Sequence, residues 1–209
     1  MVRYSSEHKQ QTRDSIVREA AVELRRSGPD KVSVALIMKR AGLTHGGFYA
    51  HFDSKEALLQ TALQWMFTDR QNYFAGLLQR YGQQQGLSRY IDAYLSDMHR
   101  NHPESGCPLP ALGADVSRLP QALQQAYQDG VASILQTFSQ ALPEFFQTQR
   151  EQVARSAFAE LSGAILIARS IHCPQEAGQW LRSSRESLKA RLQLPLDNPE
   201  GQDHVSATE

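Results

Sequence analysis

The feature that most restricts how this chain can fold is a pair of short helical patterns separated by a glycine-centred break. They lie in the stretch 33–56, which reads SVALIMKRAGLTHGGFYAHFDSKE. The apolar residues of the first pattern recur at the spacing of one helix face: Val34, Ile37, Met38 and Ala41. Gly42 suits the left-handed position past a helix end, and Thr44 suits the N-cap of a second helix that runs to about His51. This spacing is typical of a helix-turn-helix.

The second pattern is too short and too rich in Gly, His and Tyr to be held by helix propensity. Gly46 and Gly47 remove side chains where a backbone can approach another surface closely. Phe48 and Phe52, four residues apart, are expected to anchor the opposite side to the core. The pattern therefore predicts a helix with one packed wall and one bare, polar wall, which suits a major groove about 12 Å wide.

A long helix is expected to follow directly. Asp53 is expected to cap it, with Glu56 completing a capping box. From Ser54 the apolar pattern continues to near Gly82, which corresponds to a helix of roughly 40 Å at 1.5 Å per residue. Such a helix can connect an N-terminal head to a second domain.

The stretch 33–56 resembles the DNA-binding signature of TetR-family transcriptional regulators. The usual form of that signature is roughly T/S-x-x-x-I-A-x-x-A-G-V-S-x-G-x-L/F-Y-x-H/Y-F-x-S/N-K-E-x-L. The residues that match it by type and spacing are Ser33, Ile37, Ala41, Gly42, Gly46, Phe48, Tyr49, His51, Phe52, Ser54, Lys55, Glu56 and Leu58. The departures, Met38, Leu43 and Thr44, keep size or capping function. Together with the preceding helix, the resemblance covers about residues 10–60.

The resemblance implies an all-α fold of about nine helices, with a three-helix head and a C-terminal effector-binding and dimerisation domain. It also implies a regulator of transcription that binds double-stranded DNA. The residues it places at the DNA, either on phosphates, on base edges or as supports, are Ser33, Thr44, His45, Gly46, Phe48, Tyr49, His51 and Lys55. For Tyr49 a core position is the alternative, and for Lys55 a solvated surface charge. Two heads on a two-fold axis would read a palindrome.

The composition sets weaker limits. The first 60 residues hold ten Lys and Arg against seven Asp and Glu, an excess of +3, whereas the whole chain has a net charge of zero. An excess of positive charge on the head would favour contacts with phosphates, but an ordinary solvated surface can carry the same charge. No apolar run reaches the roughly 18 residues that a membrane span needs, the N-terminus lacks the apolar region of a secretory signal, and two cysteines make no disulfide framework. A cytoplasmic protein is expected.

Beyond the head, breaks at Gly and Pro divide the chain into amphipathic segments. A polar, frayed segment 1–8 and an apolar-striped helix 11–27 precede the helix-turn-helix. The helices expected after the long one are 87–100, 111–117, 120–142, 150–171 and 176–192, with a loop at 83–86 and irregular chain at 101–110. The domains are expected at 1–53 for DNA binding and 54–194 for effector binding and dimerisation, with a disordered tail at 195–209.

The two C-terminal helices, about 150–171 and 176–192, are expected to pair with a second copy as a four-helix bundle, as the resemblance also implies. A monomer core is the alternative. An effector pocket is expected among the long helix and the helices that begin near 87, 119 and 150. Its candidate residues are Met66, Tyr90, Tyr94, Met98, Cys107, Phe138 and Phe158, for which a plain apolar core is the alternative reading.

Cys107 is a candidate trigger for reactive effectors. It lies in a Pro- and Gly-rich loop near His99 and His102, and Arg100 is available to favour the thiolate. Its GCPL setting resembles that of some TetR regulators that sense electrophiles or oxidants, and a silent buried thiol is the alternative. The same residues spell H-x2-H-x4-C, which lacks a fourth ligand and fits no standard zinc pattern. We therefore expect no metal site.

The expected function is a repressor that a small-molecule or reactive effector releases from DNA. An activator of the same fold is the alternative. An enzyme on an all-helical scaffold is a weaker one, because the chain has no GxSxG, no phosphate-binding P-loop and no HExxH. No catalytic residue and no cofactor are expected.

Overall fold

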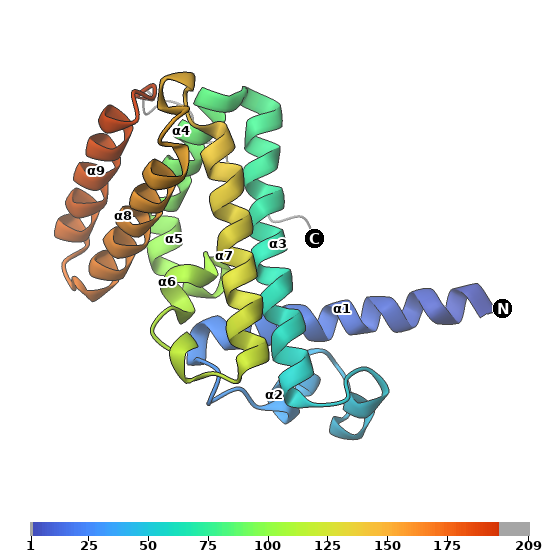
Figure 1. Cartoon of the computed structure of the whole chain (residues 1–209). Helices are drawn as coiled ribbons and strands as arrows, with labels where there is room; N and C mark the ends of the chain where they lie inside the picture. Colours follow the sequence, from blue (N-terminus) through green and yellow to red (C-terminus); the bar gives the residue numbers. More distant parts are fainter. Residues whose placement is uncertain (1, 197–209) are drawn as a thin grey trace.

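The computed structural model describes residues 2–196, and within this range the chain is all-α (Figure 1). Nine α-helices and four short 3-10 segments account for its regular structure there, and no strand occurs among these residues. The expected fold class is therefore confirmed. The elements are α1 (Val2–Ser27), α2 (Val34–Arg40), η1 (His45–Ala50), α3 (Lys55–Tyr81), α4 (Gln83–Tyr94), α5 (Asp97–Asn101), η2 (Pro103–Ser105), α6 (Pro108–Leu112), η3 (Val116–Arg118), α7 (Gln121–Ala141), η4 (Glu144–Phe146), α8 (Arg150–Ser170) and α9 (Pro174–Arg191).

The head consists of α1, α2 and η1 packed on the first half of α3. Ser33 caps α2, since its hydroxyl accepts a hydrogen bond from the Leu36 N–H at 3.4 Å. Gly42, at φ 74°, ends this helix in the left-handed region, and the Leu43 N–H closes the turn on the Met38 carbonyl at 2.8 Å. The helix-turn-helix geometry that the sequence predicts is thus present in the backbone.

Helix α3 joins the head to the rest of the molecule. Its 27 residues belong to two apolar cores, because Leu58 through Phe67 pack in the head while Phe74 packs in the second domain. The head core also includes three residues that arrive from α6 and α7: Leu112, Leu123 and Ala126. The two parts of the molecule are therefore packed together along α3 rather than joined by a flexible linker.

The second domain is built on α3 and α7, which run side by side over most of their length (Figure 1). Helices α4 and α8 cover its apolar core, and α9 lies outermost against α8. An ion pair joins α9 to α4, with Lys189 Nζ 2.6 Å from Asp92 Oδ2. Lys189 is almost fully buried, so this pair fixes the position of α9 against the domain.

Several element boundaries differ from those expected. α1 begins at Val2, so the segment 1–8 is not frayed where the structure describes it. Ser54 rather than Asp53 caps α3, with its hydroxyl 3.0 Å from the Ala57 N–H. Residues 83–86 are not a loop, because Gly82 alone, at φ 79°, turns the chain between α3 and α4. At the other end, the Pro195 carbonyl accepts a hydrogen bond from Ser88 at 2.7 Å, and residues 197–209 of the expected tail lie outside the described range.

The expected helix 87–100 is two helices. α4 ends at Tyr94, and Ser96 begins α5 by accepting a hydrogen bond from the His99 N–H at 3.2 Å. Part of the segment 101–110 is also helical, since η2 and the start of α6 lie within it, and the expected helix 111–117 is replaced by the end of α6 and by η3. Among the described residues, no helix is both long and apolar enough to cross a membrane.

Candidate nucleic-acid interface

The candidate recognition segment, η1, is a six-residue 3-10 helix. Thr44 occupies its N-cap but makes no side-chain cap hydrogen bond, contrary to the expected capping role. The segment is held instead by its aromatic anchors: Phe48 is 2% exposed, and its ring stacks on that of Phe52 with 5.9 Å between centroids. Because so short a helix is not stable by itself, burial of these two rings determines its position.

The opposite side of η1 faces outward. Ser33, Thr44, His45 and Gly46 are exposed, and Tyr49 is 69% exposed, so the core alternative for Tyr49 is wrong. The candidate set also included Phe48, which is buried and therefore acts only as an anchor. A Cβ added to Gly46 would meet no atom within 4 Å, so nothing in the protein requires glycine there.

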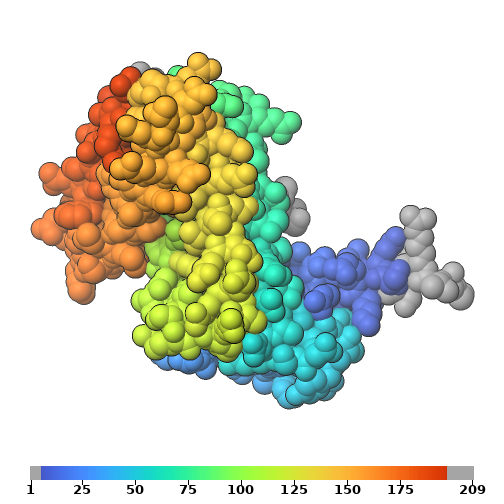
Figure 2. Space-filling view, viewed as in Figure 1, coloured from blue at the N-terminus to red at the C-terminus, as the bar shows by residue number. Residues whose placement is uncertain are grey.

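Two further candidates, His51 and Lys55, are half-buried beside this surface. Burial lowers the pKa of His51, and the positive charges of Lys9 and Arg13 on α1 lower it further. The N-terminal half of α1 therefore lies close to η1, and it projects from the rest of the chain on the side of the head (Figures 1 and 2). The sequence analysis did not single out Arg13, which falls within the helix expected at 11–27.

Five of the seven candidate effector residues meet in the second core: Tyr90, Tyr94, Cys107, Phe138 and Phe158. Their rings are in contact, with centroid distances of 5.0 Å for Phe138 and Phe158 and 6.2 Å for Tyr94 and Phe158. Phe74 of α3 stacks on Tyr90 at 4.1 Å. In this structure the aromatic core is thus packed, as the alternative reading of an apolar core describes.

The other two candidates, Met66 and Met98, are not part of that core. Met66 is fully buried, but in the head core, because the first half of α3 passes through the head. Met98 is 69% exposed, because α4 ends at Tyr94 and the helical spacing that placed Met98 inside does not continue past that point. Neither residue therefore lies in the core where the pocket was expected.

Cys107 is buried at the edge of the aromatic core, and burial raises the pKa of its thiol. A hydrogen bond to Tyr94 and the charges of Arg70 and Arg25 oppose this effect without cancelling it. The expected role of Arg100 is wrong: its guanidinium donates to the carbonyls of Ala168 and Ile171 at the end of α8, at 2.8 and 2.7 Å.

The two histidines near Cys107 have other partners than its thiol. His99 Nδ1 donates to the Tyr94 carbonyl at 2.7 Å, and its Nε2 accepts from the Cys107 N–H at 3.0 Å. His102 Nδ1 lies 3.5 Å from a Glu104 carboxylate oxygen. No cluster of three or more potential metal ligands exists among the described residues.

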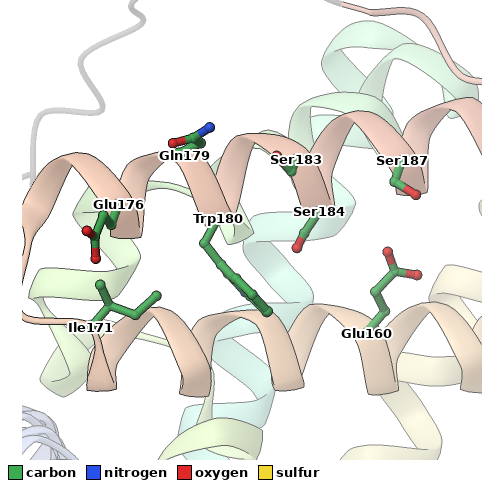
Figure 3. Close-up of a pocket in the computed structure, with 8 residues that line it drawn as sticks. All are labelled: Glu160, Ile171, Glu176, Gln179, Trp180, Ser183, Ser184 and Ser187. Carbon is green, nitrogen blue, oxygen red and sulfur yellow. The ribbon is translucent and has the colours of Figure 1, made fainter.

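A groove of about 610 Å³ lies along the line where α8 and α9 pack together (Figure 3). Trp180 of α9 reaches across it toward α8. Two of the residues that line this groove, Ile171 and Trp180, are apolar, and the rest are polar or charged. The lining residues are Glu160, Ile171, Glu176, Gln179, Trp180, Ser183, Ser184 and Ser187. Leu166 and Ile167 of α8 are exposed as well, so the α8–α9 pair carries large apolar side chains without a cover in the single chain.

The head has the arrangement of a helix-turn-helix, a class of domain that binds DNA. Residues 16–62 match the family model of bacterial regulatory proteins of the tetR family. That match covers the head, and solved structures of TetR-family regulators share the fold of the longer chain. A search of curated protein sequences finds no match.

Solved structures share this fold across nearly the whole chain. The reduced form of E. coli NemR has a TM-score of 0.73 at 23% identity, with 86% of this chain and 96% of that chain covered. A TetR-family regulator from Cytophaga hutchinsonii has a TM-score of 0.74 at 19% identity, with coverages of 91% and 98%. A TetR regulator from Chloroflexus aurantiacus J-10-FL has a TM-score of 0.74 at 21% identity, with 90% of this chain and 96% of that chain covered. At sequence identities this low, the similarity shows a shared fold and nothing more specific.

Proposed function

We propose that this chain is a repressor that binds a palindromic operator as a homodimer and leaves it when an effector binds or reacts. The observation that supports this most is the outward surface of η1, where Thr44, His45, Gly46 and Tyr49 are exposed above a buried aromatic anchor. This surface combines hydrogen-bonding groups with a backbone free of side chains at Gly46. His51 and Lys55 follow it in sequence, and with Ser33 at the start of α2 they are proposed to contact phosphates.

A dimer follows from the size of the head and from the α8–α9 face. One small module buries only about 600–1,000 Å² on DNA, which is little for specific binding. Leu166, Ile167 and Trp180 are exposed on α8 and α9 and would be covered by the same face of a second copy, as a four-helix bundle. The two recognition segments would then read half-sites about 34–36 Å apart, or a multiple of that distance.

The effector is proposed to act on the aromatic core around Tyr90, Tyr94 and Phe158. Since these rings pack closely here, a ligand between them, or an adduct on Cys107, favours a looser arrangement and shifts the population toward it. Release of DNA follows if that arrangement places the two heads wrongly for the operator.

The segment between α5 and α6 offers a path from this core to the head. Arg26 of α1 pairs with the Glu104 carboxylate at 3.3 Å, and the buried Arg25 donates to the Glu104 carbonyl at 3.2 Å. Three residues further on lies Cys107. Any change at Cys107 that moves this segment therefore acts directly on α1.

The experiment that tests the function is selection of duplex DNA from a random pool by the full chain. It is repeated with an electrophile, an oxidant and apolar ligands present. The expected result is a palindromic consensus, bound with a steep salt dependence and lost with one class of compound. Failure to bind any duplex at low ionic strength would refute the proposal. A promoter fused to the selected operator separates repression from activation, and saturable turnover without DNA binding would favour an enzyme.

A further inference from the structure

Arg13 of α1 contacts the end of the recognition segment in two ways. Its guanidinium carbon lies 4.0 Å from the centroid of the Phe52 ring, and its Nη1 donates a hydrogen bond to the carbonyl oxygen of His51. His51 is the residue at which η1 ends, and Phe52 is buried immediately after it. Both contacts therefore hold the C-terminal end of η1.

Apart from its buried aromatic anchors, Phe48 and Phe52, the recognition segment has few other constraints. At its start, Thr44 supplies no side-chain cap, and η1 itself has only six residues. At its end, the His51 and Phe52 N–H groups both donate to the Phe48 carbonyl, at 2.9 and 3.1 Å. The carbonyls of the last turn have no partner further along a helix, so a guanidinium donor there satisfies one of them and offsets the negative end of the segment.

We propose that Arg13 is a positioning residue for DNA recognition, which fixes the orientation of η1 without touching DNA. The ring of Phe52 and the carbonyl of His51 hold its guanidinium from two sides. Cation–π contacts and hydrogen bonds from charged donors are among the stronger interactions at a half-exposed position. The inference rests on the proposed DNA-binding function, in which η1 presents Thr44, His45 and Gly46.

The first test needs no DNA. Hydrogen exchange of the His51 and Phe52 amides is measured in the free, full-length protein. Arg13→Gln is expected to speed their exchange about tenfold, because the segment loses a charge-assisted hydrogen bond and a stacked cation. Arg18→Gln is the matched control, since Arg18 is an exposed arginine on the same helix, and it should leave these two amides unchanged. Amides of α7 report whether the rest of the fold is intact.

The second test compares binding to the selected operator with binding to unrelated duplex. Arg13→Gln is expected to lower the ratio of the two affinities about tenfold while the salt slope stays constant, since no phosphate contact is lost. Phe52→Leu keeps the apolar anchor but removes the aromatic face. The two changes should be non-additive in a double-mutant cycle, because each breaks the same contact. Arg13→Lys keeps a cation and a donor but not the planar stack. Its affinity ratio should therefore lie between those of the wild type and Arg13→Gln.

The outcomes separate the possible failures. A salt slope reduced by about one, with additive effects of the two substitutions, would mean that Arg13 binds a phosphate directly and would overturn the inference. An unchanged affinity ratio together with unchanged exchange would overturn it as well. If the wild-type protein binds no duplex at all, the proposed function fails, and the exchange rates alone then decide whether Arg13 holds η1. If Arg13→Gln does not fold, Arg13→Lys carries both measurements.

Discussion

The Nε2 atom of His99 accepts a hydrogen bond from the backbone N–H of Cys107, 3.0 Å away. Its Nδ1–H donates to the Tyr94 carbonyl, so both ring nitrogens are used only when the imidazole is neutral. Gly106 makes this approach possible, because a Cβ there would lie 2.5 Å from the His99 ring. One side chain thus joins the end of α4 to the residue before α6.

Stability should depend on pH through His99. Burial lowers its pKa from 6.5 to about 4 in the folded chain. Between these two pH values the unfolded chain binds the proton and the folded chain does not. The contribution of neutral His99 to the free energy of unfolding is therefore complete above pH 6.5 and is lost as the pH falls to about 4. The loss corresponds to about 3 kcal/mol. Denaturant unfolding at several pH values measures it. His99→Gln should remove this part of the pH dependence, and His172→Gln, at an exposed site, should keep it.

Gly46→Ala should separate folding from DNA binding. The added methyl meets no protein atom, and the φ of Gly46 is not positive, so stability should stay equal or rise by up to about 1 kcal/mol. Operator affinity should fall about tenfold or more, since a methyl there pushes base edges away and each base contact is worth about 1–3 kcal/mol. Gly76→Ala in α3, equally unobstructed, is the control and should bind normally. Normal binding by Gly46→Ala would remove Gly46 from the interface.

Lys55→Ala should weaken binding to all duplex sequences alike. Lys55 lies in the first turn of α3, beside η1, where a phosphate contact releases one counterion. The plot of log affinity against log salt should therefore flatten by about one. Arg155→Ala removes a positive charge from α8, which is not part of the head, and should leave the slope as it is. An unchanged slope for Lys55→Ala would exclude a phosphate contact.

Ile167→Glu should convert the proposed dimer to a monomer. Ile167 is exposed on α8, and a carboxylate there would be buried without a partner in a four-helix bundle. Light scattering at micromolar concentration measures the mass, and operator affinity should fall with it. Phe145→Glu changes a similarly exposed apolar residue in η4, which is part of neither α8 nor α9, and should stay dimeric. A monomeric wild-type protein would contradict the dimer itself.

Cys107→Ser should abolish release of DNA by a reactive aldehyde, quinone or peroxide, if the reactive form of the effector hypothesis holds. The thiol is 2% exposed and its pKa is raised, so its reaction in the free protein should be slow and should speed up when the core loosens. Gel shifts with and without the compound measure release. Cys173→Ser, at the less buried cysteine, should respond like the wild type. A full response from Cys107→Ser would assign release to another site.

The parts of the fold predicted correctly are those with local causes. The left-handed Gly42, the long apolar stripe after Ser54 and the breaks near Pro120 and Pro174 each depend on a few neighbouring residues. The signature of the helix-turn-helix also placed the recognition segment. Asp53 and Ser54 show the limit of such reasoning, because both side chains suit an N-cap and only the backbone path selects Ser54.

The parts missed depend on contacts distant in sequence. Met66 lies on the same helix as Phe74, and periodicity cannot show where that helix passes from one core to the other. Met98 was placed by continuing a helical spacing across Leu95, where the helix ends. Arg13 meets His51 across 38 residues, and nothing in its own neighbourhood marks it. Packing of whole elements determines these positions.

Because α3 is shared by both cores, small rotations in one core become displacements in the other. Its 27 residues extend about 40 Å. Phe74 lies about 29 Å from the N-terminal end of α3, so a tilt of about 5° there would move that end by about 2.5 Å. This is comparable with the roughly 3.4 Å between successive phosphates of one strand along the duplex axis. A small adjustment of the aromatic rings would thus displace the head by most of one nucleotide step.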